Sequence, residues 1–284
     1  AQVCSDNDIP VVICIPEDCS HDLWVRRRLH ECVKVVAVPH GCDYYDAITV
    51  GEKLAHDSRF FLEGGAKNIA RRDGMGTTLL SFAEETQRIP DAYFQAVGSG
   101  TGAIAAWENA QRLEADGRFG SNKMRVYVAQ NAPFTLIADS WKAGSRELAS
   151  LSPEVGRRNA EMVLAKVLAN RKPPYSLAGG LYDVLTASNG ACLTCSNDEL
   201  LYSMLLFRNL EGYDLLPAAC CAVSSLINAV HSGLVKKDEF IMLNCTGGGS
   251  MASMSMGYKL KEPDLIVSPD VDDDELIREV NRLF

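Results

Sequence analysis

Two short runs that are apolar at every position but Lys34 constrain the fold of this chain most strongly. Residues 9–15 form one run, closed by Pro16, and residues 33–38 form another, closed by Pro39. Strands that are apolar at every position are typical of parallel sheets buried on both faces, and they need a crossover helix to connect them. Residues 20–32, between the two runs, have helical spacing. The chain therefore begins as strand, helix and strand, which predicts an α/β fold.

The same alternation continues along the rest of the chain. Further strands are expected at residues 60–62, 93–97, 124–130, 181–185 and 240–243. Helices are expected at residues 43–56, 74–86, 103–113, within 147–174, at 198–211, at 217–232 and from the acidic residues 270–275 onward. Asp43 is a candidate N-cap. We expect two domains with parallel sheets and flanking helices, a small one at residues 1–68 and a large one at residues 69–284.

Charge and composition exclude several classes of partner. The net charge of −9 argues against nucleic-acid and anionic-membrane surfaces, which need clustered lysine and arginine. No basic leader opens the chain, and no uncharged apolar run approaches the roughly 20 residues that cross a bilayer. The ten cysteines are scattered through apolar runs, where free thiols behave as small hydrophobes. We therefore expect a reducing, cytoplasmic location.

A glycine-rich loop lies between an expected strand and an expected helix. It consists of Gly98, Ser99, Gly100, Thr101 and Gly102. Small residues let backbone N–H groups approach an anion, and the helix that follows directs its unpaired N–H groups and positive dipole end to the same place. The loop therefore predicts a phosphate cradle, although a tight turn chosen for packing stays open.

A dinucleotide site is a weaker interpretation of the same loop. Gly98, Gly100 and Ala103 satisfy the G-x-G-x-x-G/A pattern. That fingerprint also needs an acidic residue at the end of the next strand to hold the ribose. Here the strand ends with Gln130 and Asn131, which argues against a dinucleotide.

Two further clusters are candidates for binding. Thr246 stands before three glycines after the last expected strand, where ligands of parallel sheets bind, although a bland turn explains the glycines equally well. Arg72 lies among glycines at the expected domain boundary, and its planar fork suits phosphate or carboxylate, the alternative being a solvated surface pair with Arg71.

Cys192-x-x-Cys195 has no second pair or nearby histidine, so we expect no metal.

The order of these motifs resembles a known family. Arg72-Asp73-Gly74-Met75-Gly76-Thr77, the 98–102 loop, Pro217-Ala218-Ala219 and Thr246-Gly247-Gly248 follow one another as in the threonine synthases of the fold-type II pyridoxal-phosphate enzymes, and most resemble their cysteate synthase branch. The resemblance implies a tryptophan synthase β-like fold with pyridoxal 5′-phosphate as cofactor. It further implies β-replacement on O-phospho-L-serine by sulfite, giving L-cysteate and phosphate for coenzyme M biosynthesis.

The resemblance also implies roles for particular residues. Gly98, Ser99, Gly100, Thr101 and Gly102 would hold the cofactor phosphate, and Thr246 would hydrogen-bond the pyridine nitrogen. Arg72 and Lys67 would bind the phosphorylated substrate. The family's cofactor-bearing lysine and its Ser-Gly-Asn-Thr-like substrate loop are not present. We therefore expect no catalytic residue in this chain, which begins partway through the small domain and is inactive as it stands.

Alternatives remain open at this point. Leu216 stands where threonine synthases commonly carry glutamate, which makes threonine synthase a weaker choice than the cysteate synthase branch. The related alternatives are threonine synthase itself and an O-phosphoserine cysteine synthase using sulfide. An alternative from a different functional class is a non-catalytic short paralogue, which would bind the cofactor or phosphorylated amino acids. The family implies small-molecule partners and a homo-oligomer, with no nucleic acid and no membrane.

Overall fold

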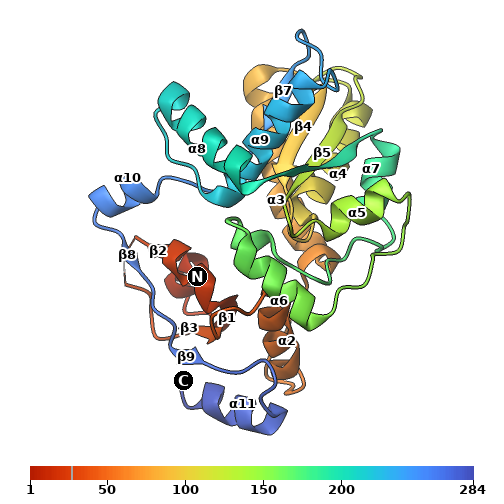
Figure 1. Ribbon diagram of the computed structural model, residues 1–284. Helices are drawn as coiled ribbons and strands as arrows, with labels where there is room; N and C mark the ends of the chain where they lie inside the picture. The colour runs from red at the N-terminus through yellow and green to blue at the C-terminus, as the bar shows by residue number, and fades with distance from the viewer. Residues whose placement is uncertain (27) are drawn as a thin grey trace.

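The computed structural model describes residues 1–26 and 28–284 and consists of two parallel sheets with helices on their faces (Figure 1). The first sheet has the strand order β1 (Val11–Pro16), β3 (Val33–Val38), β9 (Leu265–Ile266). Both pairings are parallel. Helices α2 (Tyr44–Leu54) and α11 (Asp273–Asn281) pack with β3 in one hydrophobic core cluster. This cluster includes Val36 of β3, Val50 of α2 and Leu276 of α11.

The second sheet is parallel throughout. Its order is β6 (Ala191–Cys195), β5 (Arg125–Asn131), β4 (Ala92–Ala96), β7 (Ile241–Leu243). Tyr93 and Val126 on one face pack with α3 (Ile69–Thr86), α4 (Thr101–Asp116) and α7 (Leu181–Ala187). Phe94 and Tyr127 on the other face stack on each other and pack with α9 (Pro217–His231). Figure 1 shows the helices on both sides of this sheet.

The remaining elements connect or flank the sheets. The helices among them are α1 (Gln2–Asp6), α5 (Leu136–Lys142), α6 (Pro153–Met162), α8 (Asn197–Glu211) and α10 (Ser250–Ser255). The short 3-10 turns are η1 (Glu17–Asp22), η2 (Gly65–Lys67) and η3 (Lys166–Leu168). An antiparallel ribbon joins β2 (Trp24–Val25) to β8 (Lys259–Leu260). Among the described residues, no helix combines the length and apolar character needed to span a bilayer.

The α/β fold class is confirmed, and most expected elements are present. β3 spans the expected residues 33–38, and α2 has Asp43 as its N-cap, with Asp43 and Asp46 forming a reciprocal capping box. α4 is longer than expected, because it begins at Thr101 inside the glycine loop. α3 begins at Ile69, so Arg72 lies in its first turn instead of before it.

Three expected elements are wrong. The helix expected at 20–32 is replaced by the end of η1 and by β2, because Trp24 and Val25 pair with residues 259–260 far along the chain; residue 27 lies outside the described residues. The expected strand 60–62 is irregular, and Phe61 is 90% exposed. The expected strand 181–185 is helix α7, whose Leu181, Val184 and Leu185 are buried at helical spacing.

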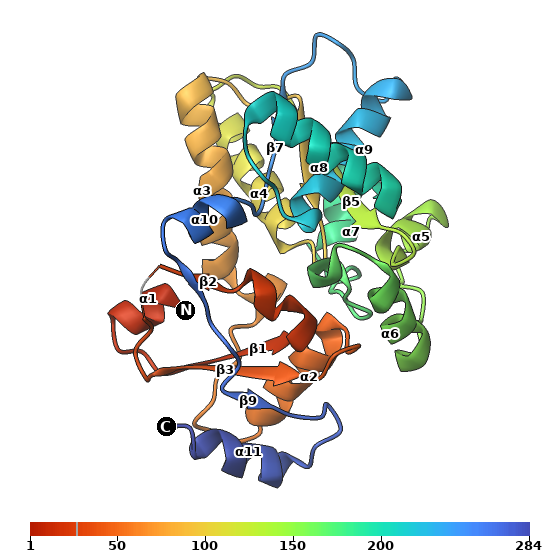
Figure 2. The same ribbon diagram turned by 60° about the vertical axis from the view of Figure 1, so that its left-hand side comes forward.

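The C-terminal residues return to the first sheet. β9 pairs with β3, and Figure 2 shows α11 beside α2 at the far end of the molecule from β7. The division into domains at residues 68 and 69 stays a prediction, but the segment from β9 onward packs with the smaller sheet. That sheet is thus built from both ends of the described chain.

Candidate functional site

The glycine loop lies at the carboxyl end of β4 and forms the start of α4. Gly100 is the N-cap of α4 with φ +84°, a left-handed conformation that favours glycine. A Cβ at Gly100 would lie 2.8 Å from Leu181 Cδ2, so the neighbouring side chain leaves no room for one. Ser99 Oγ and Thr101 Oγ1 are 2.9 Å apart. Thr101 and Gly102 are buried, whereas Gly98 and Ser99 are half-buried.

This geometry suits an anion. The first N–H groups of a helix have no intrahelical partner, and they carry the positive end of the helix dipole. Gly100 and Gly102 bring the backbone close to its surroundings because neither has a side chain. The loop and the first turn of α4 can therefore donate several backbone hydrogen bonds to a phosphate.

Thr246 follows β7, and β7 is the neighbour in the sheet of β4, which leads into the glycine loop. The N–H of Asn244 donates to the carbonyl oxygen of Phe94 at 2.9 Å, so β7 and β4 still pair as the second loop begins. Thr246 itself is exposed. The N–H of Leu216 donates to Gly247 O at 3.1 Å, which ties the loop to the start of α9. Two predicted cofactor-binding segments therefore leave the same edge of one sheet.

Arg72 and Lys67, the two residues predicted to bind the substrate, are in neither of these loops but in α3 and η2. Arg72 Nη1 donates to Ala66 O at 3.0 Å, and its Nε lies 3.3 Å from Glu108 Oε2 on α4. Glu108 is seven residues beyond Thr101, about 10 Å along the helix axis. Lys67 ends η2 and is exposed. The structure thus brings Arg72 to the flank of α4 and does not show it in contact with the glycine loop.

The sequence reasoning missed a polar network beneath the two loops. Tyr93 and Gln95 are on the α4 face of β4, where apolar side chains are expected, and both are buried. Tyr93 donates its hydroxyl proton to Gln95 Oε1 at 2.6 Å and accepts from Asn244 Nδ2 at 2.7 Å. Burial raises the pKa of the Tyr93 hydroxyl well above its usual value, so the phenol stays protonated. The sequence signal that could have revealed this network is the pair of polar residues, Tyr93 and Gln95, at alternate positions of a buried strand.

A second buried amide lies at the end of the next strand. Gln130 Oε1 accepts from the N–H groups of Ile137 and Ala138, at 2.9 and 3.1 Å, and so caps α5. Its Nε2 has no hydrogen-bond partner among residues 1–26 and 28–284. Gln130, whose identity argued against a dinucleotide site in the sequence analysis, therefore has a structural role at the start of α5.

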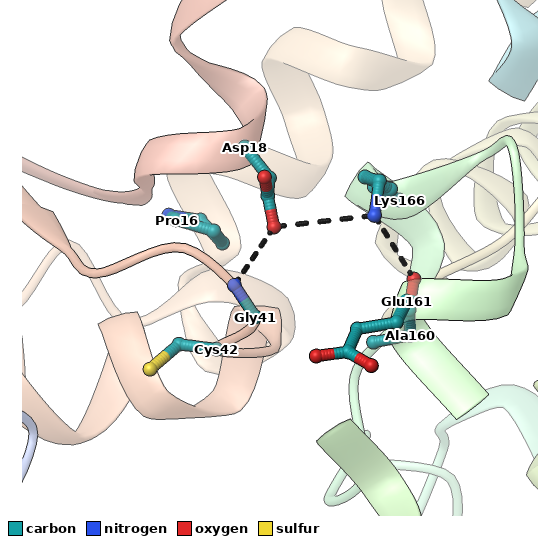
Figure 3. Close-up of a pocket in the computed structure, with 7 residues that line it drawn as sticks. All are labelled: Pro16, Asp18, Gly41, Cys42, Ala160, Glu161 and Lys166. Carbon is teal, nitrogen blue, oxygen red and sulfur yellow. Dashed lines mark hydrogen bonds and ion pairs between the residues drawn. The ribbon is translucent and has the colours of Figure 1, made fainter. Parts of the chain in front are cut away.

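A small hollow lies where residues of the first sheet's segment, among them Asp18 and Gly41, meet α6 and Lys166 of η3. Figure 3 shows Asp18 and Gly41 facing Lys166 across it. Asp18 accepts from the N–H of Gly41 at 3.0 Å and lies 3.9 Å from Lys166 Nζ. Burial opposes ionisation of Asp18, but the His40 hydrogen bond and the other contacts outweigh it and lower its pKa. The next residues of η3 approach the loop, because a Cβ at Gly98 would meet Val167 O and Leu168 Cα at 3.4 Å.

The cysteines form no disulfide and no metal site in the described part of the chain. All ten are free thiols, as the sequence predicts. Cys195 and Cys221 approach to 3.2 Å between their sulfur atoms in the core between β6 and α9. No group of three or more potential metal ligands occurs among residues 1–26 and 28–284.

Comparisons with known proteins place these features in context. The family model described as pyridoxal-phosphate dependent enzyme matches residues 1–247. The chain is 44% identical over 242 residues to the cysteate synthase of Methanocella paludicola, covering 84% of this chain and 56% of that protein. It is 42% identical over 270 residues to the cysteate synthase of Methanosarcina barkeri, covering 94% and 65%. The chain therefore spans about three fifths of the length of these relatives.

The similarity extends to solved structures. Serine racemase from Dictyostelium discoideum superimposes with a TM-score of 0.50 and 16% sequence identity, covering 77% of this chain and 69% of that one. At this identity the likeness concerns the fold alone. It agrees with the α/β arrangement of parallel sheets described above.

Proposed function

Because the chain belongs to the family of pyridoxal-phosphate dependent enzymes, we propose that it forms the cofactor-binding part of a β-replacement enzyme acting on O-phospho-L-serine. Sulfite replaces the phosphate of that substrate, and the products are L-cysteate and inorganic phosphate. The bond from Cβ to the phosphate oxygen breaks, and a bond from Cβ to the sulfite sulfur forms. The observation that carries the proposal is the pair of loops at the carboxyl ends of the adjacent strands β4 and β7.

The residues of the first loop fit a phosphate group. Gly98, Ser99, Gly100, Thr101 and Gly102 would hold the cofactor phosphate through the N–H groups at the start of α4. The cradle depends on missing side chains, because a Cβ at Gly100 or Gly102 would meet another side chain within 3 Å. Thr101 adds a hydroxyl beside Ser99. The donor set is neutral, and the helix dipole supplies the positive potential.

Thr246 would contact the other end of the cofactor. Bound pyridoxal phosphate supplies an electron sink for the bond-breaking steps at the substrate. A neutral hydroxyl at the pyridine nitrogen leaves the ring a weaker sink than a carboxylate would, which favours elimination and replacement at Cβ. Thr246 is exposed and comes two residues after Asn244, whose N–H donates to Phe94 O of β4, so it can face a ring whose phosphate lies at Gly98–Gly102.

The substrate phosphate would be received by Arg72, with Lys67 nearby. Both belong to the segment that begins α3, which packs along α4. Arg72 is paired with Glu108, so binding the phosphate requires the guanidinium to exchange or share that partner. A fork of two N–H donors suits a phosphate oxygen pair.

We expect the lysine that carries the cofactor to lie outside these 284 residues. Lys34 is part of β3, Lys53 donates to Val271 O at 2.6 Å, and Lys166 lies near Asp18. None of these positions is at the glycine loop or at Thr246. The matched cysteate synthases are longer than this chain, which leaves room for such a residue.

The test uses the protein expressed from its complete gene. It is mixed with pyridoxal phosphate, O-phosphoserine and sulfite, and cysteate and phosphate are measured. Stoichiometric cysteate and phosphate support the proposal. Threonine from phosphohomoserine, or cysteine when sulfide replaces sulfite, would assign a related synthase instead. Cofactor binding without any turnover would assign the non-catalytic paralogue. We further expect a cytoplasmic homo-oligomer.

A further inference from the structure

The hydroxyl of Tyr93 is the centre of a hydrogen-bonded chain inside the second sheet. Tyr93 lies in β4 with no exposed surface, facing α4. Its proton goes to Gln95 Oε1 at 2.6 Å, and its oxygen accepts from Asn244 Nδ2 at 2.7 Å. The chain therefore runs from Asn244 through Tyr93 to Gln95, and Tyr93 is the member that joins the other two.

The Gln95 end of this hydrogen-bonded chain packs against the glycine loop. The Gln95 side chain is 93% buried and lies against the first turn of α4. A Cβ at Gly102 would lie 2.5 Å from Gln95 Nε2 and 2.6 Å from Oε1, so the amide occupies the space that a side chain would fill. The position of the Gln95 amide therefore determines how closely α4 begins above the sheet.

The Asn244 end of the hydrogen-bonded chain lies in the loop that contains Thr246. Asn244 directly follows β7, and its backbone N–H donates to Phe94 O at 2.9 Å. The side chain and the backbone of Asn244 thus both bind β4, two residues before Thr246. Figure 1 shows β7 next to β4, as their pairing requires.

We propose that Tyr93 is a positioning residue that, through Gln95 and Asn244, sets the separation between the glycine loop and Thr246. This inference rests on the proposed function, in which those two segments bind opposite ends of one cofactor. A pyridine ring and its phosphate arm span a nearly fixed distance, so a shift of either segment by a fraction of an ångström weakens one contact or the other.

A purely structural role for the hydroxyl makes a different prediction. Buried polar groups need partners, and Tyr93 supplies one to each neighbour. If that were its whole role, removing the hydroxyl would lower stability and leave the bound cofactor unchanged. Positioning predicts that the affinity and the spectrum of the bound cofactor change as well.

Tyr127→Phe is a matched control for Tyr93→Phe. Tyr127 lies in the neighbouring strand β5, is 2% exposed, and also has a hydrogen-bonded hydroxyl, which accepts from Arg125 Nη1 at 2.8 Å. It is on the face that packs with α9, away from the glycine loop and Asn244. Each variant loses one phenol oxygen from the interior of the same sheet.

The experiment titrates pyridoxal phosphate into the protein expressed from its complete gene and records binding, the absorption spectrum and the ³¹P resonance of the bound phosphate. We expect Tyr93→Phe to weaken binding about tenfold, as the loss of one or two hydrogen-bond contacts would, and to shift both spectra. Tyr127→Phe should keep the affinity and both spectra of the unaltered protein. Equal affinity and spectra for Tyr93→Phe and the unaltered protein would overturn the inference.

A second variant covers the case in which Tyr93→Phe does not fold. Gln95→Leu breaks only the link between Tyr93 and Gln95, and by itself it should weaken binding and shift both spectra. Where Tyr93→Phe does fold, the double variant should bind no more weakly than the weaker-binding of the two single variants, because both changes break one hydrogen-bonded chain. Additive losses would overturn the inference. Failure of the proposed function looks different, because the unaltered protein would then not bind pyridoxal phosphate at all.

Discussion

Arg171 Nη2 donates to Asp46 Oδ1 at 2.6 Å, and both side chains are buried. The same guanidinium also pairs with Asp43, the N-cap of α2. Arg157 on α6 adds two hydrogen bonds to Asp46, at 3.0 and 3.1 Å. Since α2 covers the first sheet and Arg171 precedes α7 of the second, this buried charge cluster joins the two sheets. Figure 2 shows α6 and α2 next to each other at this junction.

Arg171→Met should destabilise the protein strongly. It leaves two buried carboxylates without their shared partner, and breaking a buried ion pair costs about 3–5 kcal/mol. Urea unfolding at pH 7 measures the loss. Arg59→Met is the control, because Arg59 pairs with Asp57 at the surface and should matter little. Equal effects of the two variants would contradict a structural role for the cluster.

The acid stability of the protein should depend on Asp46. Burial opposes its ionisation, but hydrogen bonds from Arg157 and Arg171 outweigh burial and lower its pKa to about 2 from the ordinary 3.8. Because the folded-state pKa is below the unfolded one, the stabilisation is present above about pH 4 and is lost as the pH falls towards 2. Asp43 partly offsets this, because burial raises its pKa despite the pair with Arg171.

Asp46→Asn tests this dependence. The variant keeps an oxygen for the hydrogen bonds but has no carboxylate to protonate. Its unfolding free energy should be lower than that of the unaltered protein at pH 5 and should fall less steeply between pH 4 and pH 2. Parallel curves for the two proteins over that range would show that Asp46 does not govern the acid limb.

Gly100→Ala should impair cofactor binding, whereas Gly117→Ala should not. Both glycines have positive φ, +84° and +77°, at opposite ends of α4, so each alanine costs about 1–2 kcal/mol in backbone strain. Only at Gly100 would the new Cβ also meet Leu181, whereas nothing lies within 4 Å at Gly117. Thermal unfolding and pyridoxal phosphate titration separate the two effects. Unchanged binding by folded Gly100→Ala would refute the phosphate cradle.

Arg72→Ala should impair the use of O-phosphoserine. If its guanidinium binds the substrate phosphate, its loss should lower kcat/KM by about 30-fold, the equivalent of about 2 kcal/mol. Steady-state kinetics of the protein from its complete gene measures this. Arg71→Ala is the control, because Arg71 pairs with exposed Glu63. If KM for O-phosphoserine were the same in both variants, Arg72 would serve only to hold Glu108.

The elements that could be predicted are those whose signal is local. Asp43 caps α2 through Asp46 three residues later, and β3 is apolar at every position except Lys34, so neither signal depends on distant residues. The expected strand at 181–185 is wrong because a short apolar run fits a helix as well as a strand. The sequence did not indicate β6, which pairs with β5 on the side away from β4 and which contains Cys192 and Cys195.

For the candidate site, the sequence located both loops but not what lies between them. Gly98–Gly102 and Thr246 are recognisable because glycines at strand ends are a local pattern. Arg72 was grouped with them by sequence order, yet its partner is Glu108 on the flank of α4. The Tyr93, Gln95 and Asn244 chain joins residues 151 positions apart, which no local pattern reveals.

By itself, the sequence determined the α/β alternation, the helix cap at Asp43 and the glycine loop, because strand burial, capping and left-handed backbone depend on a few neighbouring residues. Only the tertiary structure decided that residues 265–266 complete the first sheet, that Arg171 joins the sheets, and that Tyr93 links the two loops. Those contacts form between distant segments, and their free energy depends on burial and partner geometry that exist only once the chain has folded.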